Sequence, residues 1–561
     1  MTLAERFLQH VERSPDQPAV RIQHAGRPDV ALSYSQLWKG AARYAQAYQR
    51  EALAPGDVVI LVLQHGEDLV SSFWGAVVHG AVPAIMPFLT EKLSPEQYRN
   101  DLKALLSVTR PAAVVTYPEF EPHVRAAVST DSVVRAVLST QDVRERTDGA
   151  PVFNAFTSRA ADEIALLQHS SGTTGLQKGV ALSHRAVLNQ LDAYGRTLQI
   201  RAEDVIVSWL PLYHDMGLIA GFLLPILSGI PLVLSSPFDW VRAPWRLLQA
   251  VSRYRGTLSW LPNFAYNFMA QKVRDRDLEG VDLASWRTIV NCSEPVRWES
   301  HKAFFDRFEK YGLHWNSLQT SYAMAENVFG VTQSEISGEP AIQDLDREAF
   351  MEARVARPAV GGIPALRIMS SGKPLPNTRV RILDDQGAPL PDSKIGEIAI
   401  QSDCMLTGYY NRPDADREAF HDGWYLTGDY GYLSRGALYV AGRKKDIIIV
   451  GGKNIYPQDL EALSYEVPGI HPGRSVAFGV FDEELGTEDV CMVVEADTDD
   501  PAQQRRLEGL IRGHVTKNSA VTLRQARVVG PKWILKTSSG KVARGANREK
   551  FLRELAGSSN E

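Results

Sequence analysis

The 561-residue sequence contains only three cysteines, Cys292, Cys404 and Cys491, which lie far apart in the chain. This number and spacing exclude a disulfide framework and a cysteine-rich zinc site. The sequence also lacks a charge excess, because 61 basic and 66 acidic residues give a net charge of −5. That balance offers no electrostatic basis for binding nucleic acid or an anionic membrane surface. We find no internal repeat, and we expect a globular protein of the reducing cytoplasm.

Long stretches without charge are rare, and the one at 217–236, GLIAGFLLPILSGIPLVLSS, is long enough to cross a membrane. Pro225, Pro231 and three glycines divide it into a helix-sized and a strand-sized piece. This favours the buried core of a large α/β domain over the alternative of a membrane span. The amino terminus predicts an amphipathic helix that ends near Ser14, and its acidic residues argue against a signal peptide.

The length predicts at least two domains, since a chain of this size exceeds a single core. Apolar runs typical of strands alternate with helical patterns, which predicts parallel α/β layers. The strand-like runs are 57–63, 112–117, 163–168, 231–235 and 287–293. From about Gly361 the sequence becomes rich in β and turn signals, as in a small barrel or antiparallel sheet, and a compact α+β unit follows Lys445. We therefore predict a large N-terminal domain (1–443) and a small C-terminal domain (444–561).

One short stretch, HSSGTTGLQKGV at 169–180, combines hydroxyl groups, glycines and a single lysine. Its loop residues are Ser170, Ser171, Gly172, Thr173, Thr174 and Gly175. Glycines let the backbone approach a ligand closely, and the N–H and O–H donors together with Lys178 suit a polyphosphate. Gln177 before the lysine excludes a Walker A motif. A polar surface turn is the alternative, but the predicted strand before the loop and the helix capped at Ser183 favour a phosphate site.

Six further segments follow this loop in order along the chain. They are LPLYHDMGL (210–218), TSYAMAEN (320–327), IGEIAI (395–400), GYYNRPDADREAFHDGWYLTGDYG (408–431), GRKKDIIIVGGKNIYPQDLE (442–461) and KTSSGKVAR (536–544). Together they resemble the adenylate-forming superfamily of acyl-CoA synthetases, peptide-synthetase adenylation domains and luciferases. The resemblance implies a large N-terminal domain, a small mobile C-terminal domain and two reaction steps. A carboxylate attacks the α-phosphate of ATP, pyrophosphate leaves, and the acyl-adenylate then passes to a thiol.

The resemblance also implies where the nucleotide binds. The loop from Ser170 to Lys178 would hold the β- and γ-phosphates, and Glu326 matches the family's magnesium ligand. Tyr322 matches the aromatic ring that stacks on adenine, and Asp429 would accept hydrogen bonds from both ribose hydroxyls. Four further residues are implied: Ser293, Glu294 and Pro295, whose backbone would line the adenine pocket, and Arg443, whose side chain would reach the ribose.

The resemblance gives two lysines of the C-terminal part roles in the two reaction steps. Lys541 resembles the lysine that bridges the substrate carboxylate and the α-phosphate, where it stabilises the charge of the transition state. Lys445 falls at the family's hinge. Rotation there would move Lys541 away after adenylation and bring the GGKNIYP segment to the active site.

The acyl pocket is expected to be apolar. His214 lies in the YHDMG segment, which in the family adjoins this pocket, so we expect it to shape or gate the pocket. A metal-binding or general-base role for His214 lacks a partner at suitable spacing. Phe264 and its neighbours Tyr266, Phe268 and Met269 are predicted to line the pocket. Cys292 has no His or Asn partner in sequence reach, which favours a buried filler over a nucleophile.

Several positions resemble the fatty acyl-AMP ligase branch, which passes acyl groups to acyl carrier protein. These are LPNFAYNF (261–268), NCSEPV (291–296), Ala325, YPQDLE (456–461) and the long stretch between Glu326 and RVRILD (379–384), where that branch carries an insertion. We interpret the polar, loop-like segment 336–358 as that insertion, packed on the large domain. GGKNIYP resembles CoA ligases instead, so free CoA remains the alternative acceptor. A non-catalytic relative that only binds nucleotide or acyl chains would lack Lys541, Glu326 or the hydroxyl loop, and all are present.

Overall fold

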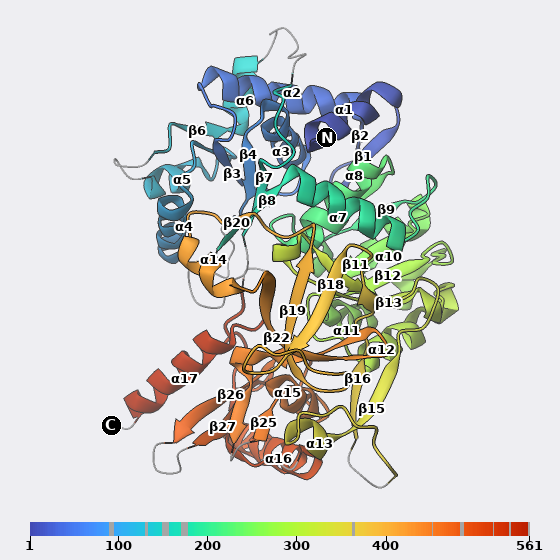
Figure 1. Cartoon of the computed structure of the whole chain (residues 1–561), viewed down its shortest axis with the longest axis vertical. Helices are drawn as coiled ribbons and strands as arrows, with labels where there is room; N and C mark the ends of the chain where they lie inside the picture. The colour runs from blue at the N-terminus through green and yellow to red at the C-terminus, as the bar shows by residue number, and fades with distance from the viewer. Residues whose placement is uncertain are drawn as a thin grey trace.

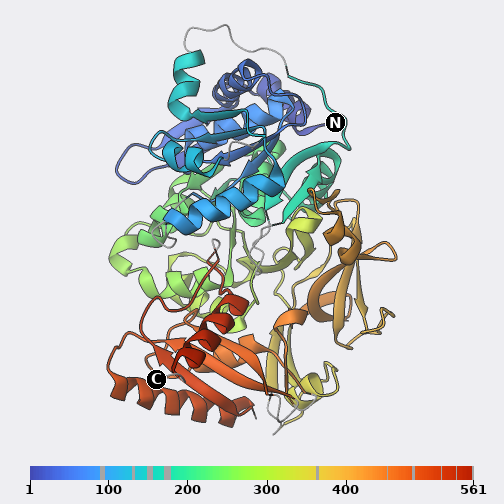
Figure 2. The same ribbon diagram turned by 90° about the vertical axis from the view of Figure 1, so that its left-hand side faces the viewer.

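The computed structural model describes residues 1–88, 95–128, 133–147, 156–169, 178–361, 365–450, 453–482, 487–519, 521–537 and 540–558. Figures 1 and 2 show a large part that runs from blue to light orange, with a C-terminal unit in orange and red packed against its lower end. The fold is mixed α/β, which confirms the predicted class. The predicted boundary at 443/444 coincides with a 3-10 turn, Lys444–Asp446, between strands β23 (Ala437–Arg443) and β24 (Ile448–Val450).

A large central sheet places the candidate site. Its strand order in the described residues is β17-β14-β13-β12-β11-β9-β10-β1-β2. The strands are β1 (Pro18–Gln23), β2 (Val30–Ser33), β9 (Ile206–Ser208), β10 (Leu232–Ser235), β11 (Leu258–Leu261), β12 (Thr288–Asn291), β13 (Leu318–Ala323), β14 (Gly330–Gln333) and β17 (Lys373–Pro374). Strands from β13 to β1 run parallel. Because the carboxyl ends of parallel strands meet at one edge, the segments after β9, β11 and β12 and the end of β13 lie together.

A second, parallel sheet has the order β4-β3-β5-β6, with β3 (Val58–Val62), β4 (Val82–Ile85), β5 (Ala113–Thr116) and β6 (Ala136–Ser139). All residues of β3 are buried, as expected for a strand covered on both faces. Helices surround both sheets (Figure 1). They are α1 (Leu3–Arg13), α2 (Tyr34–Arg50), α3 (Glu67–His79), α4 (Pro95–Thr109), α5 (Glu121–Ala127), α6 (Thr140–Thr147), α7 (His184–Thr197), α9 (Pro237–Arg242), α10 (Trp245–Tyr254), α11 (Asn263–Lys272) and α12 (Trp298–Phe308).

The apolar stretch 217–236 is core, as the sequence favoured. It forms a π-helix, η1 (Met216–Leu223), followed by the short helix α8 (Leu224–Ser228) and strand β10. Asp215 caps η1 by accepting a hydrogen bond from the Met216 N–H at 2.7 Å. In the part of the chain that is described, no helix is long and apolar enough to span a membrane.

The β-rich region forms an antiparallel sheet in the order β18-β19-β22-β21, with β23 paired to β22. Its strands are β18 (Thr378–Leu383), β19 (Gly396–Ser402), β21 (Phe420–His421) and β22 (Trp424–Ser434), and helix α14 (Pro413–Ala419) lies beside it. A separate sheet, β20-β8-β7, joins β7 (Ile164–His169), β8 (Gly179–Ser183) and β20 (Gly408–Tyr409). The strand β8 runs into α7, which is capped at Ser183 as predicted: its hydroxyl accepts from the Ala186 N–H at 3.1 Å.

The C-terminal unit has its own apolar clusters. It contains the hairpin β24 and β25 (Lys453–Ile455), helix α15 (Pro457–Tyr465), the sheet of β26 (Ser475–Asp482), β27 (Thr487–Glu495) and β28 (Leu523–Val529), helix α16 (Pro501–Ser519) and helix α17 (Arg544–Ser558). Arg544, at the start of α17, is ion-paired with Glu461 of α15 and lies 3.5 Å from Asp446 beside the 443/444 boundary. This buried network ties the lysine-bearing loop before α17 to the rest of the unit.

The expectation that 336–358 is loop-like was wrong for residues 342–351, which form a strand and a helix. This region belongs to an ordered hairpin unit, which we call the latch: β15 (Ile342–Asp346), helix α13 (Arg347–Met351) and β16 (Ala365–Met369). Its side chains Leu345 and Phe350 are each only 1% exposed, in a cluster with tyrosines of β22 and β23. The elements are too short, and carry too few apolar residues, for a periodic pattern to be visible in the sequence.

The close approach of η1 to the YHDMG turn requires glycine at 217, because a Cβ there would lie 2.2 Å from the Pro211 carbonyl oxygen. Alanine in a helix is normally favoured over glycine by roughly 0.5–1 kcal/mol. Overpacking against backbone costs about 1–3 kcal/mol, so we expect Gly217→Ala to lower the melting temperature. The matched control is Gly195→Ala in α7, whose Cβ would meet only Ile200 at 3.7 Å. Equal melting temperatures for the two variants would contradict this packing.

Candidate active site

A carboxylate, a phenol and a guanidinium meet at the junction of the central sheet and the β-rich sheet. The Tyr322 hydroxyl, near the end of β13, donates a 2.6 Å hydrogen bond to Asp429 Oδ2 on β22. Arg443 pairs with Asp429 in the β22–β23 register, and its Nε lies 3.8 Å from Asp429 Oδ1. Burial raises the pKa of Asp429, whereas Arg443 and the Tyr322 hydrogen bond lower it. The sequence named all three residues, and the structure brings them together.

A second cluster surrounds Glu326, which lies in the 3-10 turn Ala325–Asn327. Glu326 Oε1 accepts a 2.9 Å hydrogen bond from the Tyr409 hydroxyl, which is also 2.9 Å from the Tyr425 hydroxyl. Lys178 Nζ lies 4.8 Å from the centre of the Tyr409 ring. Burial raises the pKa of the Glu326 carboxyl, against the hydrogen bond from Tyr409. Sequence reasoning missed both tyrosines. The candidate phosphate loop, Ser170 to Gly175, lies outside the described residues.

Lys541 comes from the C-terminal unit, yet its charge acts within the large part. It follows Gly540, whose φ of +88° favours glycine, and its backbone N–H donates to Thr537 Oγ1 at 3.2 Å. Burial and the nearby Arg443 lower the pKa of Lys541, whereas Asp215 and Glu294 raise it. Groups from three segments of the large part therefore act electrostatically on this ammonium.

His214 and Asp215 form a close pair, with 2.6 Å between His214 Nδ1 and Asp215 Oδ1. The sequence offered no group to orient this histidine, and the structure shows that its immediate neighbour does so. Burial tends to raise the pKa of Asp215, but His214 and Lys541 bring it below its usual range. Asp215 thus serves both as the cap of η1 and as the partner of His214.

An aromatic wall lies next to this pair. Trp209 and Trp240 stack with ring centres 3.6 Å apart, and Phe264 meets both edge-on. The Phe264 N–H donates to Glu294 Oε2 at 2.9 Å, which connects the wall to the groups near Lys541. Phe268 also faces Trp240, as expected for a shared apolar surface.

Two of the residues predicted to line the pocket do not face it. Tyr266 and Met269 are fully buried, and Tyr266 stacks on His301 of α12 at 5.0 Å. They therefore belong to the core beneath α11. Cys292 is also fully buried, with its Sγ 3.1 Å from the Met216 sulfur, which fits the predicted filler.

The segment Ser293-Glu294-Pro295 follows β12 directly and turns sharply, since Ser293 has a φ of +68°. Burial raises the pKa of Glu294, while its bond from Phe264 and the nearby Lys541 lower it. Lys445 lies in the 3-10 turn before β24, and burial together with Arg443 lowers its pKa. Both segments therefore border the same charged site.

Direct contacts hold the C-terminal unit against the large part. Arg297, at the start of α12, donates from Nη2 to the Gln458 carbonyl at 3.0 Å and to Asp459 Oδ1 at 3.1 Å. The latch adds a second set of contacts, and Figures 1 and 2 both show it beside this unit. Its members are the Glu352–Lys453 ion pair (2.5 Å), the Arg354–Asn454 hydrogen bond (3.4 Å) and the Phe350–Tyr456 ring contact (5.4 Å).

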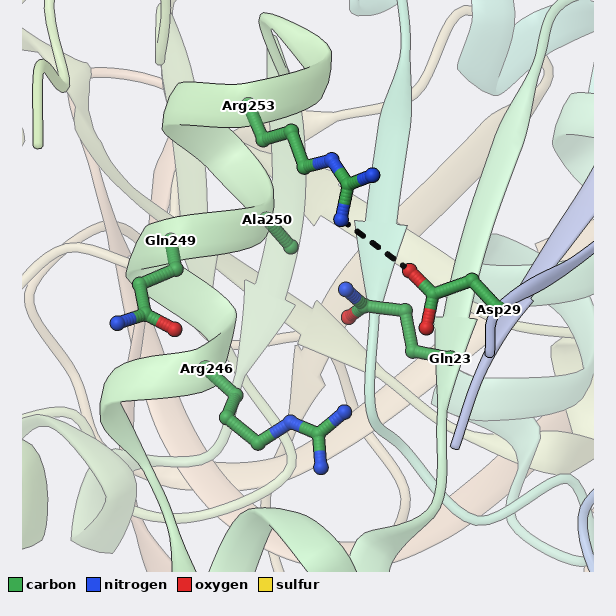
Figure 3. A pocket seen from close by; sticks show the side chains of 6 residues that line it. All are labelled: Gln23, Asp29, Arg246, Gln249, Ala250 and Arg253. Atoms are coloured by element: carbon green, nitrogen blue, oxygen red, sulfur yellow. Dashed lines mark ion pairs between the residues drawn. The ribbon is translucent and has the colours of Figure 1, made fainter. Parts of the chain in front are cut away.

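A polar hollow of about 160 Å³ lies elsewhere, between β1 and α10 (Figure 3). Arg253 is 3.7 Å from Asp29 there, and Arg246 donates to the His24 carbonyl at 2.7 Å. Its arginines thus contact neighbouring chain segments, and none of the candidate residues lines it. The candidate site residues therefore lie apart from this hollow.

These features form a candidate site to which both the large α/β part and the C-terminal unit contribute residues. Residues 7–410 match the AMP-binding enzyme family, and the chain belongs to that family. It is 30% identical to the long-chain-fatty-acid–AMP ligase FadD28 of Mycobacterium tuberculosis, over 94% of this chain and 93% of that protein. It is 29% identical to the medium-chain-fatty-acid–acyl-carrier-protein ligase JamA of Moorena producens, over 95% and 91%.

The fold agrees with these relatives. A solved structure from work on the fatty acyl-adenylate ligases of E. coli and L. pneumophila matches with a TM-score of 0.91 and 28% identity, over 99% of this chain and 98% of that one. The findings confirm the resemblance to adenylate-forming enzymes, with the fatty acyl-AMP ligases among the relatives. The protein is a ligase of this type.

The contacts of Arg297 predict how firmly the C-terminal unit is docked. Arg297→Ala removes two hydrogen bonds across the interface, one of them in a half-buried ion pair worth about 1 kcal/mol. We expect trypsin to cut at Lys444 or Lys445 roughly fivefold faster in this variant, as followed by electrophoresis. Lys302→Ala is the control, because Lys302 pairs only with Asp306 on the same helix. Identical cleavage rates would show that Arg297 does not hold the unit in place.

Proposed function

We propose that the protein activates a fatty acid with ATP to an acyl-adenylate, and transfers the acyl group to the phosphopantetheine thiol of an acyl carrier protein. The observation that carries this proposal is the position of Lys541. This lysine of the C-terminal unit is coupled electrostatically to Arg443, Asp215 and Glu294 of the large part, and it also acts on Asp429. A cation at that place can bind the substrate carboxylate and the α-phosphate together and stabilise the transition state.

The nucleotide would bind between the two parts. Asp429 is oriented by Tyr322 and Arg443, so it is prepared to accept hydrogen bonds from the ribose hydroxyls. The Tyr322 ring and the backbone of 293–295 would hold the adenine. Ser170 to Gly175 and Lys178 would bind the leaving pyrophosphate. These residues need only position the phosphates, because phosphoryl and adenylyl transfer require no covalent bond to the protein.

Glu326 would hold magnesium. In the described residues no group of three or more His, Cys, Asp or Glu side chains could ligate a metal. A single carboxylate nevertheless fits Mg²⁺, which usually takes one or two carboxylates and completes its shell with phosphate oxygens and water. When bound, the ion would neutralise charge on the pyrophosphate. The protein's part is to present the Glu326 carboxylate at a fixed place beside Lys178.

The substrate is proposed to be an apolar acid. Phe264 and Phe268 are partly exposed and contact the ring of the buried Trp240, so they offer an apolar surface. Asp215 is a carboxylate that could bind a substrate ammonium, but it already pairs with His214 and caps η1. Displacing both partners would leave a buried histidine and a helix N–H unpaired, which is unfavourable. The arrangement therefore favours a fatty acid over an amino acid.

We infer the acceptor of the acyl group from the contacts of the latch with the C-terminal unit. Its contacts with Lys453, Asn454 and Tyr456 favour the arrangement in which Lys541 reaches the large part. Thioester formation in the family requires rotation at the hinge, so these contacts would disfavour the second step. A carrier protein can offset them with its own binding energy, whereas free CoA has little surface for this. Gly451 and Gly452, which belong to the GGKNIYP segment that resembles CoA ligases, lie outside the described residues.

Lys541→Ala separates the two steps. We expect adenylation, measured by pyrophosphate release, to fall by roughly 10²–10³-fold, as when one preorganised donor is lost. Thioester formation from synthetic acyl-AMP should stay near the wild-type rate, because Lys541 acts only in the first arrangement. Lys517→Ala, an exposed lysine of α16, is the control for a change of charge on the same unit. A parallel loss of both steps would refute the assignment.

The double variant Glu352→Ala/Arg354→Ala tests the acceptor. It removes the contacts of Glu352 and Arg354 with the C-terminal unit, together with the Arg354–Asp385 ion pair, and it leaves the buried Leu345 and Phe350 in place, which a deletion of the segment would expose. We expect the ratio of acyl-CoA formed to pyrophosphate released to rise roughly threefold to tenfold, at an unchanged rate of adenylation. Arg357→Ala is the control, because Arg357 pairs with Asp346 inside the latch. A wild-type enzyme that consumes CoA as fast as it releases pyrophosphate would instead identify an acyl-CoA ligase.

A further inference from the structure

Tyr409 lies between Lys178 and Glu326, and its contacts with both residues suggest a role beyond packing. It lies on β20, a strand of only two residues that pairs Tyr409 with Val180 of β8. The Tyr410 N–H donates to the Gly179 carbonyl at 2.7 Å, and the Thr407 N–H donates to Ala181 at 2.8 Å. These bonds fix the backbone beside Lys178, the first described residue after the phosphate loop. The Tyr409 side chain is only 6% exposed, so its orientation is set by packing.

The Tyr409 hydroxyl is a link between two chemical groups. A carboxylate only accepts hydrogen bonds, so the Tyr409 proton points to Glu326 Oε1 and Tyr425 donates to the Tyr409 oxygen. The Leu406 N–H also donates to the Glu326 backbone carbonyl at 2.8 Å. The segment that carries Tyr409 therefore holds Glu326 through both its side chain and its backbone, in a cooperative chain of hydrogen bonds.

The Tyr409 ring makes a different contact. Lys178 Nζ lies 4.8 Å from its centre, within the range of a cation–π interaction. One side chain thus contacts the cation through its face and the carboxylate through its hydroxyl. Any shift of the ring would change the position of Lys178 relative to Glu326.

We propose that Tyr409 is a positioning residue that fixes the distance between Lys178 and Glu326, so that magnesium pyrophosphate is bound as one unit. The proposal rests on the proposed role of Glu326 as magnesium ligand. Tyr409 itself touches no reacting atom. Its effect would come from preorganisation: the metal and the lysine contact the same phosphate groups, and a carboxylate free to rotate would lose its share of that binding.

The test is the binding of inorganic pyrophosphate to the full-length protein, measured by calorimetry with and without MgCl₂. Tyr409→Phe keeps the ring and removes the hydroxyl. We expect it to weaken binding about 10-fold with magnesium, as for the loss of a hydrogen bond to a charged group, and to leave magnesium-free binding unchanged. Tyr409→Leu also removes the surface under Lys178, so it should weaken binding under both conditions. Tyr410→Phe, the same chemical change one residue on, should match wild type.

Two outcomes would overturn the proposal and are distinguishable. If magnesium strengthens wild-type binding and Glu326→Gln abolishes that gain, but Tyr409→Phe keeps it, then Tyr409 has no positioning role. If magnesium does not strengthen wild-type binding, the role of Glu326 fails and the proposal fails with it. Should Tyr409→Phe not fold, as judged by circular dichroism, Tyr425→Phe removes the donor to the Tyr409 oxygen. That variant should show a smaller, magnesium-specific loss, and unchanged binding would refute the link.

Discussion

The arrangement of this protein depends on one charge, the ammonium group of Lys541, which is partly buried and interacts electrostatically with groups of the large part. Removing an ion from water costs several kcal/mol, and only opposite charges close by can offset that cost. Asp215 and Glu294 supply those charges from the large part. The docked position of the C-terminal unit therefore depends on the attraction between Lys541 and these two carboxylates. Arg297 and the latch add contacts that hold it there, and a bound polyphosphate would shift the balance by adding negative charge beside Lys541 and Arg443.

Much of the fold could be predicted from the sequence, for a definite physical reason. Strands of a parallel sheet are covered on both faces, so β3, β5 and β10 appear as continuous apolar runs. The start of α7 was visible because Ser183 is a strong helix cap. The charged site residues were found through their motifs, and the topology explains why they meet: several follow the carboxyl ends of neighbouring strands, and the others come from the β-rich sheet and the C-terminal loop.

What the sequence did not show depends on contacts between distant segments. The latch has short elements with few apolar residues, and its helix buries Phe350 only because β22 and the C-terminal unit offer a partner. The need for glycine at 217 comes from the close approach of the Pro211 carbonyl. Tyr409 and Tyr425 join Glu326 through the pairing of strands that are far apart in the chain. None of these contacts produces a recognisable spacing of residues within a short stretch of the sequence.

The two-residue strand β20 has a consequence for the order in which the chain can fold. It covers the edge of β8, although it lies far downstream of that strand. While the chain is being synthesised, β7 and β8 emerge early, and the outer edge of β8 presents unpaired backbone groups until Tyr409 arrives. Such an edge is a template for wrong pairing between chains. The residues that bring Tyr409 to Glu326 are therefore also those that end a period of aggregation risk, which couples correct assembly of the candidate site to the solubility of the nascent protein.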